Sequence, residues 1–492
     1  MLFALGTFAA LYTLYICLRA IYYVYFHPLC HVPGPKTWIA FPILQHLSAI
    51  RGTLEKDMKC WHARFGTVVR HGRDEVSFIT ADSWKDIYGH GHSQLPKVMS
   101  SASNPADIIS ANDADHTRFR KALSHAFSAK GLQAQEPLVI GYVDKLIGRL
   151  KDIAESSLPV DMVKWYNLTT FDLIGDLAFG EPFGGLDSSE YHSWVSTVFA
   201  FVKVVPYLKA SDSYPLFCKA LLLFLPKGFL EGWKIQIHHA STTVQKRLNN
   251  PPARDRGDFM DSMLRHQGQK DGLVQHELEA NSNILIIAGS ETTATLLSGV
   301  TYWLLRTPEA LAKATREVRL AMKNEADITF HNVTTQLPYM LSCIDEAFRM
   351  YPPVPSGLQR MTLSPVCISG YELPARTKVA VHQASAYMSP ANFHSPDRFI
   401  PERWSPEAKS DPSSPFFSDN RDVLQPFSVG PRNCIGRNLA YTEMRVILAR
   451  VLWNFELELQ QDSLKWNEQK TYTLWEKPPL MCKLTRRVSF RK

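Results

Sequence analysis

The sequence lacks several features that would assign it to common protein classes. Its eight cysteines are scattered over 492 residues and form no C-x-x-C pair, which argues against a disulfide framework or zinc cluster and favours a reducing compartment. It contains no dense run of lysine or arginine and no repeat of fixed period, and its formal charge of +7 is modest, so nothing indicates nucleic-acid binding. With 45% hydrophobic and 21% charged residues, it is not a disordered or collagen-like chain.

The amino-terminal segment lacks the charged start and the small-residue cleavage site of a signal peptide, which is the competing interpretation. No charged residue precedes Arg19, and the apolar character continues to Phe26, close to the length that spans a bilayer. Its tyrosines are typical of membrane interfaces. We therefore expect a single transmembrane anchor over residues 1–26, an extended proline-rich hinge over 27–40, and the body of the protein over 41–492.

Helical spacing of apolar residues dominates the body. It occurs in five segments, 136–154, 161–179, 195–205, 311–322 and 437–455. The clearest helix is predicted from Val274 to Arg306, because it contains no proline and ends where Thr307-Pro308 disfavours helical geometry. Short strands are expected at 68–70, 76–80, 367–369 and 378–382. The predicted fold class is mainly α with small β-sheets.

The most informative segment is the loop from Phe427 to Gly436. Gly430 and Gly436 permit tight turns and close approach to a flat macrocycle. Cys434 precedes the helix predicted from residue 437, whose amino-terminal N–H groups favour a thiolate and a lowered thiol pKa. A cysteine thiolate suits haem iron because it pushes electron density onto the metal and favours O–O cleavage. The alternative is that Cys434 is a small buried hydrophobic residue.

The spacing Phe427-x-x-Gly-x-Arg432-x-Cys434-x-Gly436 resembles the haem-binding signature of the cytochrome P450s in every position. The resemblance implies haem b between a long central helix and the helix after the cysteine loop. Cys434 would be the axial iron ligand, Arg432 would reach a haem propionate, and Phe427 and Gly436 would contact the haem. Within this family the chain most resembles fungal secondary-metabolism members related to isotrichodermin C-15 hydroxylase, with which it shares segments 84–89 and 171–180.

Further segments match the family in the right order. Glu346 and Arg349 lie three residues apart on a predicted helix face, and Arg403 follows in Pro401-Glu-Arg-Trp. The resemblance implies that these three residues form a buried structural ion cluster, whereas an exposed ion pair is the alternative.

On the long helix, the resemblance assigns Glu291 and Thr292 to proton delivery above the iron. A hydroxyl that both donates and accepts, next to a carboxylate, suits a proton relay into an apolar pocket. The alternative is a threonine that only bonds back to a helix carbonyl.

Three other residues are expected to bind haem propionates by resemblance. His116 and Arg120 share one helix face at i and i+4, although many relatives have tryptophan at the position of His116, and Arg360 follows the Pro352–Leu358 turn. An exposed arginine in an ordinary salt bridge is the alternative for either arginine.

The resemblance implies a membrane-anchored monooxygenase in a fungal biosynthetic pathway of secondary metabolism, of the kind that makes mycotoxins. It would oxidise a small lipophilic substrate with O2 and two electrons that NADPH supplies through a cytochrome reductase, with cytochrome b5 as a second possible donor. The location implied is the endoplasmic reticulum membrane, with residues 41–492 on the cytosolic face. Two alternatives remain, a haem-thiolate isomerase or dehydratase and a non-catalytic haem-binding protein.

Six cations are expected to offer the reductase a basic face: Arg118, Lys121, Lys130, Arg432, Arg437 and Arg445.

Overall fold

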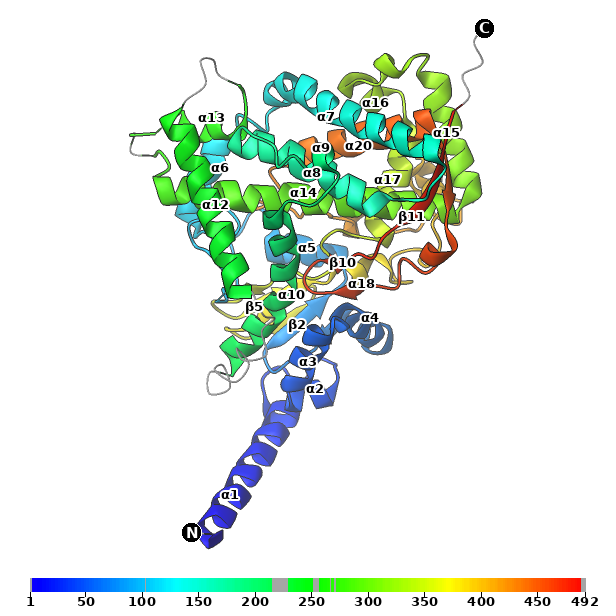
Figure 1. Ribbon diagram of the computed structural model, residues 1–492. Coiled ribbons are helices and arrows are strands. Elements are labelled where there is room, and N and C mark those ends of the chain that lie inside the picture. The colour runs from blue at the N-terminus through cyan, green and yellow to red at the C-terminus, as the bar shows by residue number, and fades with distance from the viewer. Residues whose placement is uncertain are drawn as a thin grey trace.

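The amino-terminal helix stands apart from the body of the protein. The structure is a computed structural model that describes residues 2–101, 103–214, 229–250, 256–265, 267–269 and 271–487. Helix α1 (Leu2–Ile21) continues into one π-helical segment, η1 (Tyr22–Phe26), and projects away from the body (Figure 1). The helical stretch Phe3–Phe26 is exposed and long and apolar enough to cross a membrane. A surface of this length and composition is suited to lipid rather than water.

The segment 27–40 differs from the extended hinge that we expected. It contains a turn at residues 28–31, is extended only around Pro33–Pro35, and is helical in α2 (Lys36–Ala40). Leu29 and Val32 are buried in a hydrophobic cluster of the body. The apolar residues between the prolines thus pack against the body, and burial outweighs the preference of isolated proline-rich segments for an extended chain.

Helices form most of the body, as the predicted fold class requires. Their bounds are α3 (Ile43–Arg51), α4 (Leu54–Phe65), α5 (Ala81–Tyr88), α6 (Asp113–Leu123), α7 (Ala129–Ser156), α8 (Met162–Phe179), α9 (Gly185–Ser188), α10 (Ser193–Ser213), α12 (Phe229–Asn249), α13 (Phe259–Leu264), α14 (Gln275–Arg306), α15 (Pro308–Ala321), α16 (Phe330–Thr335), α17 (Pro338–Met350), α18 (Gln383–Tyr387), α19 (Pro406–Ser410) and α20 (Arg437–Asn454). Short 3₁₀ turns are η2 (Glu325–Asp327), η3 (Pro401–Trp404), η4 (Arg421–Val423) and η5 (Gln461–Ser463).

Two predicted helices are longer than the apolar pattern indicated. Helix α7 begins at Ala129, where the side chain of Ser128 caps it, and continues through Pro137. Helix α10 continues through Pro206 to Ser213. In both helices, tertiary packing compensates for the backbone hydrogen bond that the internal proline cannot form.

The strands form four small sheets. Their bounds are β1 (Val68–Arg70), β2 (Glu75–Phe78), β3 (Val160–Asp161), β4 (Arg360–Met361), β5 (Val366–Ile368), β6 (Tyr371–Leu373), β7 (Lys378–Val381), β8 (Phe455–Leu459), β9 (Lys470–Thr471), β10 (Trp475–Glu476) and β11 (Met481–Arg486). The largest sheet has the order β1-β2-β7-β4, with β2 and β7 parallel and Val76 opposite Val379. The other sheets are β3-β11-β8, β9-β10 and β5-β6.

Helix α14 is the central element of the body, and α8 packs along it (Figure 1). It is apolar and long enough to span a membrane, yet most of its apolar stretch is buried inside the protein. Gly289 allows this packing, because a Cβ at that position would lie 3.1 Å from the Ile174 side chain of α8. Helix α20, which follows the cysteine loop, packs on the same central helix. The fold therefore brings the Glu291-Thr292 segment and the Cys434 loop to the same core.

Candidate active site

The cysteine loop is held in a tight turn that requires glycine at one position. The Cys434 amide donates to the Phe427 carbonyl at 2.9 Å, and the Asn433 amide donates to the Gly430 carbonyl at 3.1 Å. Gly430 has φ +78°, and a Cβ there would lie 1.8 Å from the Tyr88 carbonyl oxygen. Both the left-handed backbone and the close approach exclude a side chain. The Phe427 ring packs edge-on against Phe348, with centroids 5.2 Å apart, and so anchors the start of the loop.

The Cys434 side chain leaves an accessible face, although its surroundings are largely protein. We expected the helix terminus to lower the pKa of its thiol, and in the protein alone this is wrong. Burial raises the pKa, and this effect exceeds the opposing effects of the Gly436 amide, Arg120 and Arg437, which all favour the thiolate. The predicted interactions are present, but they do not outweigh the cost of burying a charge.

The residues around Cys434 fit a haem group. A Cβ at Gly436 would lie 3.9 Å from the Cys434 sulfur and 3.7 Å from the Phe127 ring, so this glycine keeps the space beside the sulfur clear. Arg120 donates to the backbone oxygen of Asn433 at 2.7 Å and to its side-chain oxygen at 2.6 Å. Arg120 therefore fixes the cysteine loop as well as adding positive charge close to the sulfur.

Five cationic or titratable side chains gather near this loop, and we call them the cation cluster: Lys97, His116, Arg120, Arg360 and Arg432. The sequence predicted four of them and missed Lys97, which forms an isolated β-bridge with Arg360 and donates to the Ile109 carbonyl. Burial, then Arg432 and Arg360, lower the pKa of Lys97 to about 7. Burial, then Arg432 and Lys97, lower the pKa of His116 to about 4.

Fewer acidic than basic side chains lie in and around the cation cluster. Among the described residues, Arg432 alone of its four basic members forms a close ion pair, with Asp113 at 2.5 Å, whereas Asp107 and Asp113 act on Lys97 only at longer range. Arg360 is 4% exposed and donates to the Leu95 carbonyl at 2.9 Å, but its Nε has no hydrogen-bond partner within the described residues. Buried, unpaired cations are costly, and carboxylate groups such as haem propionates would satisfy them.

Glu291 and Thr292 lie in the middle of α14, and their side chains bond in different directions. Thr292 donates to the Ala288 carbonyl at 2.6 Å, which is the alternative that sequence reasoning left open. Glu291 forms a buried ion pair with Lys477, which also donates to Thr295 at 2.7 Å. Neighbouring residues on a helix point about 100° apart, so adjacency in sequence does not join the two side chains. The structure thus adds Lys477 to the predicted pair.

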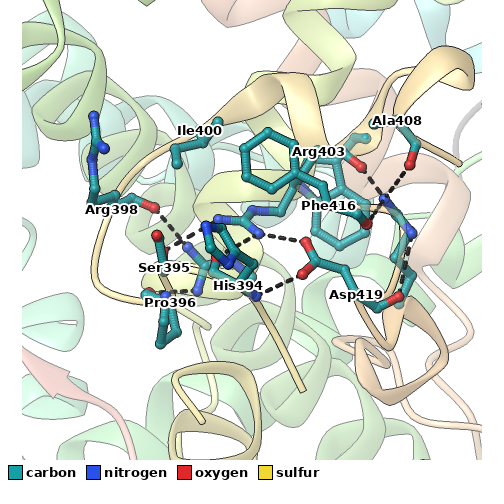
Figure 2. A network of polar contacts seen from close by, with 12 residues as sticks. His394, Ser395, Pro396, Arg398, Ile400, Arg403, Ala408, Phe416 and Asp419 are labelled. Atoms are coloured by element: carbon teal, nitrogen blue, oxygen red, sulfur yellow. Dashed lines mark hydrogen bonds and ion pairs between the residues drawn. The ribbon is translucent and has the colours of Figure 1, made fainter. Parts of the chain in front are cut away.

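Glu346, Arg349 and Arg403 are brought together in a fully buried network, which we call the ion-pair core. Glu346 accepts from Arg349 at 2.8 and 2.9 Å and from Arg403 at 3.1 Å. Asp419, which sequence reasoning missed, accepts from Arg403 at 2.5 Å. Figure 2 shows Asp419 beside Arg403, and the remaining donors reach backbone carbonyls around His394–Arg398. Each buried charge therefore has partners, as a structural cluster requires.

The missed residues carried no usable signal in the sequence. Lys477 is 186 positions from Glu291, and Lys97 comes from a segment without a regular apolar pattern. Asp419 ends the stretch 405–419, whose serines and prolines predict a surface loop, but this stretch contains α19 and its last residue accepts a hydrogen bond from Arg403.

Comparison with known proteins identifies the family. The model of the Cytochrome P450 family matches residues 32–484. The monooxygenase olcB of Penicillium canescens is 62% identical over 475 residues, which cover 96% of this chain and 97% of that protein. The trichothecene C-4 hydroxylase of Trichoderma arundinaceum is 55% identical over 471 residues, covering 95% and 94%. The monooxygenase dtxS2 of Metarhizium robertsii is 43% identical, covering 96% and 92%.

The chain is therefore a haem-thiolate protein and belongs to the cytochrome P450 family. It is a monooxygenase of the kind found in fungal secondary metabolism, and its cofactor is haem b. Members of this family generally receive their electrons from a redox partner.

Proposed function

We propose that this chain is a membrane-anchored enzyme that oxidises a lipophilic secondary metabolite in a fungal biosynthetic pathway, using O2 and two electrons from NADPH through a cytochrome reductase. The observation that carries the proposal is the accessible face of Cys434 in a loop bordered by the cation cluster. Haem bound through Cys434 would supply the activation of O2, with one oxygen atom inserted into a C–H bond and the other reduced to water by the two electrons and two protons.

The residues of the site have separable roles in this proposal. Arg360, Arg432, His116 and Arg120 hold the haem propionates, and Arg120 also holds the loop through Asn433. Phe427 and Gly436 shape the surface next to the sulfur. Thr292 and Glu291 carry protons from the exterior to the reacting oxygen, because a hydroxyl can accept one proton while it donates another.

Membrane attachment is proposed for residues 1–26, with residues 41–492 as the haem-binding catalytic domain on the cytosolic face of the endoplasmic reticulum. The exposed apolar surface of α1 supports a single-pass anchor. The packed segment after it supports a fixed orientation of the body relative to the membrane, because α2 contacts η1. Removing residues 2–26 should release the protein from microsomal membranes, and retention of the truncated chain after a carbonate wash would oppose the anchor.

The proposed basic face for the reductase needs two corrections. The Arg432 side chain is only 5% exposed and pairs with Asp113, so it is part of the cation cluster instead of a docking surface. Arg118 is committed to Glu277 through two hydrogen bonds. Of the four cations that remain, Arg445 is only partly exposed, whereas Lys121, Lys130 and Arg437 are exposed. If they guide docking, the rate of the first electron transfer should fall as ionic strength rises, and a constant rate would exclude them.

The substrate is proposed to enter beside α14. Four residues, Ile284, Ile287, Ala288 and Thr292, are partly exposed at spacings of three to four and so share one mostly apolar face. This face suits a compact lipophilic molecule. The similarity to a trichothecene C-4 hydroxylase makes an oxygenated polycyclic terpenoid the first substrate class to test. We also expect substrate contacts from the apolar stretch 195–230, but residues 215–228 of it, including the apolar run 220–225, lie outside the described residues.

The test is reconstitution of the full chain with haem, a reductase and NADPH, followed by assay of a panel of polycyclic terpenoids, polyketides and alkaloids. The proposal predicts that one class yields a product that gains one oxygen atom from ¹⁸O₂, with NADPH consumed in step. Product formed without NADPH or O2 would contradict a monooxygenase. Substrate-induced spectral changes without any product from every class would instead favour a non-catalytic haem-binding protein.

A further inference from the structure

A buried lysine from the carboxyl-terminal part of the chain meets Glu291 in the core. Lys477 lies between β10 and β11, and its side chain is only 4% exposed, while that of Glu291 is 5% exposed. Its ammonium group donates to Glu291 Oε1 and, at 2.7 Å, to Thr295. Because Thr295 lies one helical turn after Glu291, Lys477 holds the carboxylate along that face of α14.

The other oxygen of the same carboxylate is free to interact. Glu291 Oε2 is buried and has no hydrogen-bond partner among the described residues. A buried carboxylate oxygen without a donor is costly, so the interaction with Lys477 must compensate for most of the charge. The carboxylate is thus held at one oxygen and able to accept a proton at the other.

The lysine is fixed from both sides. Trp475 stacks on Tyr351, with centroids 4.6 Å apart, and donates to the Pro352 carbonyl at 2.7 Å. On the other side, Trp466 donates to the Pro478 carbonyl at 2.8 Å. Glu476 pairs with Lys203 of α10, which lies in the region proposed to meet substrate. The position of Lys477 is therefore set by packed elements and linked to α10.

The other titratable groups close to Glu291 are two tyrosines. Tyr351, which follows α17, and Tyr191, which precedes α10, are both affected by the charge of Glu291. Burial first, and then that charge, raise the pKa of the Tyr351 hydroxyl, so it stays neutral at physiological pH. Burial, together with the charges of Asp161 and Glu291, has the same net effect on the pKa of Tyr191. Lys477 is consequently the charged group that pairs with Glu291 within the described core.

We propose that Lys477 is a positioning residue for proton delivery, which holds the Glu291 carboxylate away from Thr292 until the Lys477–Glu291 pair separates. This rests on the proposed role of Glu291 and Thr292. After separation, Glu291 accepts a proton from outside at its carboxylate and passes it to the Thr292 hydroxyl oxygen, while Thr292 gives up its own hydroxyl proton toward the reacting oxygen. Each cycle returns both groups to their starting protonation states.

The first test is infrared spectroscopy of the full-length, haem-loaded protein. Lys477→Met leaves the buried Glu291 carboxylate without a cation, and because a buried, unpaired charge is costly we expect the carboxylate to take up a proton. We expect a new protonated-carboxyl band at neutral pH in Lys477→Met that is missing from wild type and from the Lys477→Met/Glu291→Gln double variant. Burial raises the pKa of Glu443 to about 8, so its own band should be constant in all variants. Absence of the new band would overturn the proposal.

The second measurement is the pH dependence of coupling, the product formed per NADPH consumed. In Lys477→Met the midpoint should move to higher pH by about one unit or more. Lys483→Met, the same change at an exposed lysine of β11, should leave the profile unchanged. If Lys477→Met does not retain haem, Lys477→Gln replaces it, because an amide preserves a hydrogen bond to Thr295. An unshifted profile in the haem-loaded variant would count against Lys477.

The single Glu291→Gln variant separates this inference from the proposed function. If the relay operates, coupling in Glu291→Gln falls about tenfold or more and hydrogen peroxide accumulates. Normal coupling in Glu291→Gln overturns the relay itself, whatever the infrared result for Lys477→Met. Reduced coupling in Glu291→Gln without a new band in Lys477→Met retains the relay and overturns only the role of Lys477.

Discussion

The ion-pair core and the cation cluster are both built on buried arginines, but their charges are balanced differently. Arg349 and Arg403 are fully buried, and Glu346, Asp419 and backbone carbonyls satisfy them. In the cation cluster, Arg360 keeps an unpartnered Nε within the described residues, and Lys97 and Arg120 have only neutral acceptors there. A balanced network stabilises a fold by itself, whereas a network short of anions is prepared for an anionic ligand.

The largest effect is expected from breaking the balanced network. Glu346→Ala leaves two buried guanidinium groups without their shared carboxylate, which should cost about 3–5 kcal/mol of folding free energy. We expect little folded, haem-loaded protein, measured by thermal unfolding and haem content. Glu309→Ala removes an exposed glutamate at the start of α15 and should have little effect. A melting temperature of Glu346→Ala equal to that of wild type would contradict a structural role.

Removing a charge from the cation cluster should weaken haem binding and leave the folding stability of the apoprotein unchanged. Arg360→Met removes a buried cation that repels Arg432, so the protein without haem should not lose stability. Haem affinity should fall about 10- to 100-fold, corresponding to the loss of one hydrogen-bonded charge of about 1.5–3 kcal/mol. Haem transfer to an apo-globin acceptor measures the affinity, and chemical unfolding of the apoprotein measures the stability. Unchanged haem release would remove Arg360 from the propionate site.

The smallest effect concerns pH and a single histidine. His116 has a pKa of about 4 in the folded protein, below its ordinary value, because of burial first and then Arg432 and Lys97. The unfolded chain therefore binds more protons between about pH 6.5 and 4. His116 thus supports stability above that window, and the contribution is lost as pH falls through it. In the apoprotein, His116→Asn should reduce the loss of unfolding free energy between about pH 6.5 and 4. His331→Asn, a change at an exposed position, should leave that loss as it is in wild type.

The sequence predicted the parts of the protein that depend on local patterns. The helix containing Glu291 was placed to within one residue at its start, because it has regular apolar spacing and a proline stop. The cysteine loop could be predicted because Gly430 and Cys434 lie at the positions that the haem-binding signature requires after Phe427. The hinge was partly wrong because the burial of Leu29 and Val32 depends on residues distant in sequence. The lowered thiol pKa was wrong because local donors were visible and burial was not.

Partners that no local pattern joins to their target could not be predicted. Lys477, Lys97 and Asp419 are ordinary surface residue types, and their roles arise only when the fold buries them beside Glu291, Arg360 and Arg403. The predicted roles of His116 and Arg360 toward haem propionates stay predictions, and the charge imbalance around them is the structural reason to test them.

The most direct test of the account is the reduced, carbon monoxide-bound spectrum of wild type and Cys434→Ser, prepared side by side with haem content and folding measured on the same samples. The account predicts that wild type gives the spectrum of a thiolate-ligated haem and oxidises substrate, and that folded Cys434→Ser has neither property. A thiolate-type spectrum with normal turnover in Cys434→Ser would show that another residue binds the iron and would contradict the account.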